Sequence, residues 1–161
     1  MITARPVFEP ADAAAGRSGR RSDMAEVSDW NRKVIEEFRA NEGQVGGAFA
    51  GAPVLLLHTW GRKTGAERVN PMMYLAEGGR TFVFASKAGA PVNPDWYHNL
   101  VANPKVTVEM GTATFPATAV PVTGPERDTI YAEQARRYPG FGEYQERTDR
   151  VIPVVELVTE S

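Results

Sequence analysis

Apolar and polar residues alternate along most of the chain in a pattern that predicts short β-strands. The segment Arg80–Lys87 illustrates it, because Phe82 and Phe84 fall on one face of a strand while Val83 and Ala85 fall on the other. Other runs have the same length and are bounded by glycine, proline or asparagine. The predicted strands cover residues 53–60, 68–79, 80–87, 105–111, 113–122 and 151–158.

Three stretches follow a helical period instead. In Ser28–Arg39, apolar residues recur on one face, and Ser28 is the predicted N-cap. A second helix is predicted to begin at Asn93-Pro94, with Asn93 as the cap and Pro94 in the first turn, and to stop before Pro104. Thr123 and Glu126 have the spacing of a capping box for a third helix, which runs through Arg136.

Short turns between neighbouring strands favour antiparallel pairing. We therefore expect an α+β fold in which about six antiparallel strands close into a barrel or pack as a sandwich, with three or so helices outside. The first 23 residues are rich in Ala, Gly, Arg and Pro and are expected to be disordered. Residues 24–161 are expected to form a single domain, and Met24 is a candidate for the true start of the protein.

Composition argues against several classes of protein, among them nucleic-acid-binding, disulfide-bonded, metal-binding and membrane-spanning proteins. The apolar fraction of 42% is ordinary for a globular protein, and a net charge of −2 argues against general nucleic-acid binding. The absence of cysteine excludes disulfides and thiolate ligands, and the two histidines have no carboxylates at ligand spacing, so no metal site is expected. The longest apolar run, Pro53–Leu57, is too short to span a bilayer, and no signal peptide is recognisable. A cytoplasmic location is expected.

The sequence GRKTG (61–65) concentrates positive charge between two predicted strands. Arg62, Lys63 and, slightly further on, Arg68 suit an anion, and glycines at both ends let the backbone approach a ligand closely. The spacing is not that of a P-loop. A polar turn whose cations merely face water explains the same residues equally well.

Two further segments are candidates for a site. Ser86 and Lys87 stand where a strand opens into a Gly/Ala loop ahead of a helix N-terminus, which favours anions. Trp96 and Tyr97 could wall a flat ring system or could be core residues of that helix. The third segment contains an aromatic stripe, Tyr138, Phe141 and Tyr144, whose spacing fits either a core or a lid over a planar ligand.

No pattern for a nucleophile, paired carboxylates or a catalytic triad is present. His58 lies in an apolar strand and is expected to be a core histidine with satisfied hydrogen bonds. If the protein is an enzyme, a bound cofactor is expected to supply the chemistry.

Three stretches together resemble the deazaflavin-dependent nitroreductase family, whose members use coenzyme F420. They are LLHTWGRKTGAERVNPMMYL, ASKAGAPVNPDWYHNLVANPKVTVE and YPGFGEYQERTDRVIPVVEL, within residues 43–158. The resemblance implies a split β-barrel, often dimeric, with a groove for reduced F420, a deazaflavin that carries a phosphate and an acidic oligoglutamate tail. It also implies hydride transfer to a small acceptor, such as a quinone, an activated alkene or a nitro compound.

The resemblance implies roles for individual residues. Arg62, Lys63 and Thr64 would hold the phosphate and early tail. The strand along the cofactor would comprise Arg68, Val69, Asn70, Pro71, Met72, Met73 and Tyr74. The strand end near the ring would comprise Phe84, Ala85, Ser86 and Lys87. The helix start that closes over the cofactor would comprise Asp95, Trp96, Tyr97, His98 and Asn99. Phe141 would face the substrate side, and Ser86, Tyr138 and Tyr144 would contact substrate or supply a proton.

Two departures and two alternatives accompany this hypothesis. Phe141 replaces a tyrosine of the family and has no phenol to donate, which argues against reduction of nitro drugs. The N-terminal helix is polar and amphipathic, which argues against peripheral membrane contact.

The alternatives are an F420-binding or carrier protein with little turnover, and a binder of FMN or haem on the same barrel.

Overall fold

The computed structural model describes residues 21–47 and 50–159, with side chains from Asp29 onward. Six strands form a closed barrel in the order β1-β2-β3-β6-β5-β4, and every neighbouring pair is antiparallel. The predicted α+β fold with six antiparallel strands is therefore confirmed, and of the two expected arrangements the strands form the barrel and not the sandwich. The strands are β1 (Val54–Trp60), β2 (Glu67–Glu77), β3 (Arg80–Phe84), β4 (Lys105–Met110), β5 (Ala113–Val122) and β6 (Val154–Thr159).

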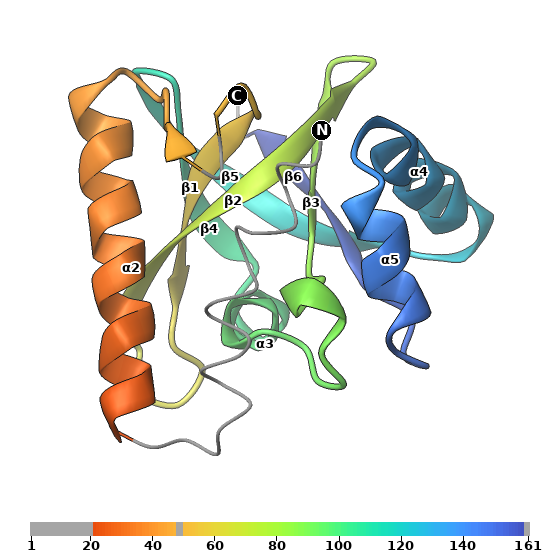
Figure 1. Cartoon of the computed structure of the whole chain (residues 1–161), viewed down its shortest axis with the longest axis horizontal. Coiled ribbons are helices and arrows are strands. Elements are labelled where there is room, and N and C mark those ends of the chain that lie inside the picture. The colour runs from red at the N-terminus through yellow and green to blue at the C-terminus, as the bar shows by residue number, and fades with distance from the viewer. Residues whose placement is uncertain (1–20, 48–49, 160–161) are drawn as a thin grey trace.

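Helices cover two sides and one end of the barrel (Figure 1). They are α2 (Arg21–Ala40), α3 (Asp95–Ala102), α4 (Gly124–Arg137) and α5 (Gly140–Glu146), with a short 3-10 turn η2 (Lys87–Gly89). In Figure 1, α2 lies on one side of the barrel, α4 and α5 lie on the opposite side, and α3 lies at the lower end beside the loops that follow β1 and β3.

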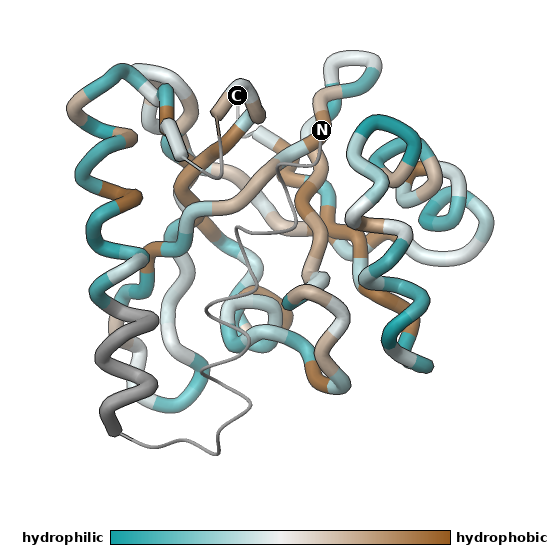
Figure 2. The backbone as a smooth tube through the Cα atoms, viewed as in Figure 1, coloured by the Kyte–Doolittle hydropathy of each residue, from teal (hydrophilic) through white to brown (hydrophobic). Residues whose placement is uncertain are grey.

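Alternation along the strands separates two hydrophobic cores. One fills the barrel interior, since it includes residues of all six strands, such as Leu57 and Val108, and is closed by Trp96 and Leu100 of α3. The other lies outside the barrel, where Phe38 of α2 and the residues of α4 and α5 pack on β1, β2, β3 and β6. Apolar residues concentrate in the strands, whereas α2 and α4 are mostly hydrophilic (Figure 2).

The predicted helix starts need correction. α2 begins at Arg21, so Ser28 lies within the helix and does not cap it. Residues 1–23 were expected to be disordered. Of these, Arg21–Asp23 belong to α2, and residues 1–20 lie outside the described range. Pro94, not Asn93, is the N-cap of α3, because the Asn93 side chain accepts a hydrogen bond from Arg150. Thr123 is the N-cap of α4 but makes no side-chain cap, so the expected capping box does not form.

None of the described helices is long and apolar enough to cross a membrane.

Candidate functional site

The loop between β1 and β2, residues 61–66, is a tight turn that presents cations to solvent; we call it the cationic loop. The Gly61 N–H donates to Ala66 O (2.8 Å), and the Gly65 N–H donates to Gly61 O (2.8 Å). Gly65 has a φ of +74°, a left-handed conformation in which a side chain is strained. The Thr64 hydroxyl accepts from the Ala66 N–H (3.2 Å) and so serves the turn itself.

A buried asparagine anchors this loop to the end of the barrel. Asn99 of α3 is 5% exposed, and its Oδ1 accepts the N–H of Arg62 (3.1 Å). Its Nδ2 donates to the hydroxyl of Thr59, the buried residue near the end of β1 (3.4 Å). Asn99 was predicted to contact a cofactor directly. The structure shows that its amide is committed to the protein, where it fixes the position of Arg62.

Three cations in and just after the cationic loop have no side-chain partner in the part of the chain that the structure describes. Arg62, Lys63 and Arg68 are exposed, and among the described residues none of them forms an ion pair or donates a side-chain hydrogen bond. Arginines elsewhere on the surface are neutralised locally, as Arg39 is by Glu109 and Arg137 by Glu133. The cationic loop together with Arg68 therefore concentrates positive charge that is available to an anion in solution.

Strand β2, which follows the loop, directs alternate side chains to the outer face and to the interior of the barrel. Val69 and Met73 lie on the helix-covered outer face, whereas Met72 and Tyr74 pack with the barrel interior. Burial raises the pKa of the half-buried Tyr74. A ligand on one face of a strand meets only alternate side chains. The seven residues of β2 predicted as a group therefore cannot all contact one cofactor through their side chains, and the 2% exposed Met72 is a core residue.

After β3 the backbone makes an unusual turn, which we call the left-handed loop, residues 85–93. Three consecutive residues, Lys87, Ala88 and Gly89, have φ of +46°, +52° and +81°. Two of these are not glycine, and such strain is typical of functional loops whose surroundings hold them in place. Ser86, just before them, is 1% exposed, and its Oγ has no hydrogen-bond partner among the described residues.

The start of α3 divides the residues that were predicted to close over a cofactor. Trp96 is 9% exposed and packs in the barrel interior, so of the two aromatic side chains it is the core residue. Tyr97 and His98 are half-buried, with their rings edge to face (5.9 Å between centroids). Asp95 is exposed. Only Asp95, Tyr97 and His98 thus keep surface at which a ligand could bind.

The aromatic stripe is mainly core. Phe141 is 1% exposed and Tyr144 is 0% exposed, and their rings meet edge to face (5.2 Å). Phe84 packs on Phe141 (5.7 Å) and on Tyr131 (5.8 Å), whose hydroxyl donates to Phe141 O (2.6 Å). Burial raises the pKa of Tyr131. The expectation that Phe141 and Tyr144 face a substrate is not met, because they seal α5 against β3.

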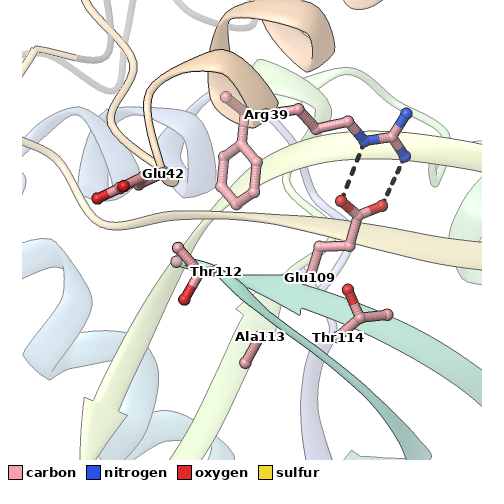
Figure 3. A pocket seen from close by; sticks show the side chains of 8 residues that line it. Arg39, Glu42, Glu109, Thr112, Ala113 and Thr114 are labelled. Atoms are coloured by element: carbon pink, nitrogen blue, oxygen red, sulfur yellow. Dashed lines mark hydrogen bonds and ion pairs between the residues drawn. The ribbon is translucent and has the colours of Figure 1, made fainter.

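His58 bridges two carboxylates on the outer face. Its Nδ1 lies 2.7 Å from Glu67 Oε2, and its Nε2 lies 2.6 Å from Glu109 Oε2. Arg39 of α2 adds two hydrogen bonds to Glu109 (2.6 and 3.0 Å), beside a small pocket that Thr112 and Ala113 help to line (Figure 3). This network ties α2 to the barrel, and the expected satisfied histidine is confirmed, although it is only partly buried.

The network predicts a pH-dependent contribution to stability. The pKa of Glu109 is held below its usual 4.5, and the largest cause is its hydrogen bonding to Arg39. A carboxylate whose pKa is lowered by folding stabilises the protein above its unfolded-state pKa, and this stabilisation is lost as pH falls through the folded-state pKa. Glu109→Gln is therefore expected to lower the free energy of unfolding by about 1 kcal/mol near pH 7.

Urea denaturation at several pH values checks this expectation. The difference between the wild type and Glu109→Gln should shrink as the pH falls below the usual carboxyl pKa of 4.5. The control is Glu36→Gln, which removes an exposed carboxylate of α2 that faces Arg32 at 3.5 Å and should change stability little at any pH. A difference that stays constant with pH would show that Glu109 does not act through its charge.

Comparison with known proteins identifies the family. The family model for F420H(2)-dependent quinone reductases matches residues 30–159. The chain belongs to this family. An F420H(2)-dependent quinone reductase of Mycobacterium tuberculosis (strain ATCC 25618 / H37Rv) is 41% identical over 127 residues, which are 74% of this chain and 83% of that protein.

Solved structures agree with this family assignment. The F420-H2 dependent reductase FDR-A is 40% identical, with a TM-score of 0.60, covering 65% of this chain and 93% of that one. A structure described as a domain-swapped dimer is 37% identical, with a TM-score of 0.62, over 81% and 98% of the two chains. The deazaflavin-dependent family and split barrel inferred from the three sequence stretches are thereby confirmed.

Several important residues of this family member were not predicted from the sequence. Arg150 donates to three backbone carbonyls of the left-handed loop, and Tyr131 supports Phe141. Arg127 of α4 donates to Gln145 Oε1 of α5 and to Ile152 O, so it connects α4 with α5 and with the segment before β6. Their partners lie 10 to 65 residues away, and no local spacing reveals such pairs.

Proposed function

We propose that the protein is an F420H2-dependent reductase that transfers a hydride from the reduced deazaflavin to a quinone-type acceptor. The observation that supports this most strongly is the group of cations Arg62, Lys63 and Arg68, which form no ion pair with any residue that the structure describes. F420 carries a phosphate and an oligoglutamate tail that would complement them. Family membership supplies the cofactor class, and the cluster supplies a place for its charge. Reduced F420, when bound, supplies the hydride.

In this proposal, residues at different positions bind different parts of the cofactor. Arg62 and Lys63 bind the phosphate and the first part of the tail, and Arg68 binds further along it. Ser86 and Lys87 lie at the end of β3, where the ring would rest against the sheet. Within the described residues the buried Ser86 hydroxyl has no hydrogen-bond partner, which fits a group that hydrogen-bonds to a ligand. The protein thereby orients the ring and excludes water from it.

The relatives suggest the class of acceptor, and the side chains that carry a hydroxyl suggest the proton source. A quinone is favoured because the curated relatives are named quinone reductases, and activated alkenes and nitro compounds are further candidates. Ser86 and the half-buried Tyr138 are the candidates for substrate contact or proton supply. Tyr144 has no exposed surface, and Phe141 has no hydroxyl. We also propose a homodimer, as one related structure is a domain-swapped dimer.

Turnover separates an enzyme from a carrier. Reduced F420 mixed with menadione and the protein is expected to be oxidised in proportion to the enzyme concentration. Binding of F420 without oxidation by menadione or a cyclic enone would favour the carrier alternative. Tight binding of FMN or haem in place of F420 would favour the other alternative.

Ser86→Ala gives a sharper test of where the ring lies. Removing a buried hydroxyl that has no partner is expected to leave stability unchanged or to raise it by up to about 1 kcal/mol. Loss of its hydrogen bond to the ligand is expected to weaken F420 binding about tenfold. Thermal melting and a fluorescence titration measure the two effects. A variant with a lowered melting temperature and unchanged affinity would place the serine in the fold and not in the site.

A further inference from the structure

The left-handed loop needs something to hold it, since a run of left-handed residues is unfavourable for Lys87 and Ala88. Gly89 packs so closely on α5 and the residue that follows it that a Cβ there would lie 2.5 Å from Tyr144 O and 2.9 Å from Arg147 Cβ. The loop therefore rests directly on the backbone of α5. This contact limits where the loop can lie but does not by itself orient the peptide groups that come before Gly89.

Arg150 provides that orientation. Its guanidinium donates Nη1 to Ala85 O (3.1 Å) and to Asn93 Oδ1 (2.6 Å), Nη2 to Ser86 O (2.7 Å), and Nε to Ala90 O (2.8 Å). The bonded groups stand on both sides of the left-handed residues, so this side chain connects the two ends of the loop. Arg147 Nη1 adds one bond within the loop, to Ala88 O (3.2 Å). A planar guanidinium can make this set of bonds, whereas an ammonium offers its donors from one point.

These bonds fix the direction of two N–H groups. In a trans peptide group the C=O and the following N–H point in opposite directions. Because the carbonyls of Ala85 and Ser86 point to Arg150, the N–H groups of Ser86 and Lys87 point away from it. The third carbonyl precedes Pro91, which has no N–H. Arg150 thus turns two backbone donors away from itself, next to the Ser86 hydroxyl, which has no hydrogen-bond partner among the described residues.

We propose that Arg150 is a positioning residue for the cofactor: its guanidinium holds the left-handed loop so that the N–H groups of Ser86 and Lys87 donate to F420. The inference rests on the proposed function. It assigns Arg150 no contact with the cofactor, and it predicts that loosening the loop lowers affinity through these two donors without altering the cationic loop, which α3 anchors separately through Asn99.

Three variants test the inference. Arg150→Ala is expected to raise the dissociation constant for F420 about tenfold or more, because displaced donors no longer meet the ligand. Added guanidinium ion, below denaturing concentrations, is expected to restore affinity in Arg150→Ala when compared with sodium chloride at equal ionic strength. Arg150→Lys should remain weak. Arg136→Ala, which removes an exposed arginine paired with Glu133 on α4, should bind as the wild type does.

Hydrogen exchange on the wild-type protein gives a result even if an Arg150 variant fails to fold. Saturating F420 should slow exchange of the Ser86 and Lys87 amides, and unchanged exchange at both would overturn the inference. A folded Arg150→Ala protein with wild-type affinity would also overturn it while leaving the proposed function intact. If the wild-type protein itself failed to bind F420, the proposed function would fail, and this inference with it.

Discussion

Replacing Arg62 and Lys63 together by alanine is expected to weaken F420 binding by about tenfold to a hundredfold while leaving the melting temperature unchanged. Both side chains are exposed and make no ion pair among the described residues, so removing them costs the fold almost nothing. Each cation is expected to contribute about 1 kcal/mol to binding an anionic tail, since solvent screens charges at an exposed site. A fluorescence titration at low salt measures the loss.

The chain contains a matched control for this variant. Arg32 and Lys33 form the same dipeptide on the exposed face of α2, where Arg32 pairs with Asp29 and Glu36. Arg32→Ala with Lys33→Ala removes the same net charge at a different place. It should leave F420 affinity within about twofold of the wild type. Equal losses in the two double variants would mean that F420 responds to overall charge and not to the cationic loop.

Gly89→Ala is expected to have the largest effect on stability, a loss of about 3 kcal/mol in the free energy of unfolding. Alanine at a φ of +81° is strained, and its Cβ would lie 2.5 Å from the carbonyl oxygen of Tyr144, which belongs to a helix and has little room to move. Relief requires α5 and the left-handed loop to separate. Because that loop carries Ser86 and Lys87, F420 affinity should fall together with stability. Urea denaturation and the titration measure the two losses.

Gly79→Ala separates strain from collision. Gly79 lies in the β2–β3 turn with a φ of +78°, and a Cβ there would meet nothing within 4 Å. This substitution should cost about 1 kcal/mol, the price of the left-handed conformation alone. If Gly89→Ala cost no more than Gly79→Ala, the close packing of the left-handed loop on α5 would not contribute to stability.

Strand alternation and short turns were sufficient to predict six antiparallel strands, since period-two patterns and antiparallel connections are local properties of the sequence. They left a barrel and a sandwich both open, and only the family resemblance favoured the barrel. They were also sufficient to place the cationic loop between two strands, because glycine and adjacent cations identify an exposed turn. The helix caps were less predictable. Asn93 and Glu126 have good local capping chemistry, but long-range partners, Arg150 and Arg80, take up their side chains.

The candidate site shows the same division between local and long-range information. Arg62 and Lys63 were predicted as anion-binding candidates from their chemistry alone, and that role stays a prediction. The roles of Asn99 and Arg150 depend on contacts 37 to 65 residues apart, and no spacing within one element indicates them. The spacing of Tyr138, Phe141 and Tyr144 is more often that of a core stripe, and a lid over a planar ligand was the alternative. Only the packing of α5 against β3 distinguishes the two interpretations, in favour of a core.

The central claim is that the cationic loop, with Arg68, binds a multiply charged cofactor tail. Titration of the wild-type protein with F420 and with FMN at low and high salt tests this claim most directly. We predict tight F420 binding that weakens steeply as salt is added, and much weaker binding of FMN, whose single phosphate meets fewer of the cations. F420 binding that is insensitive to salt, or a preference for FMN, would contradict the claim.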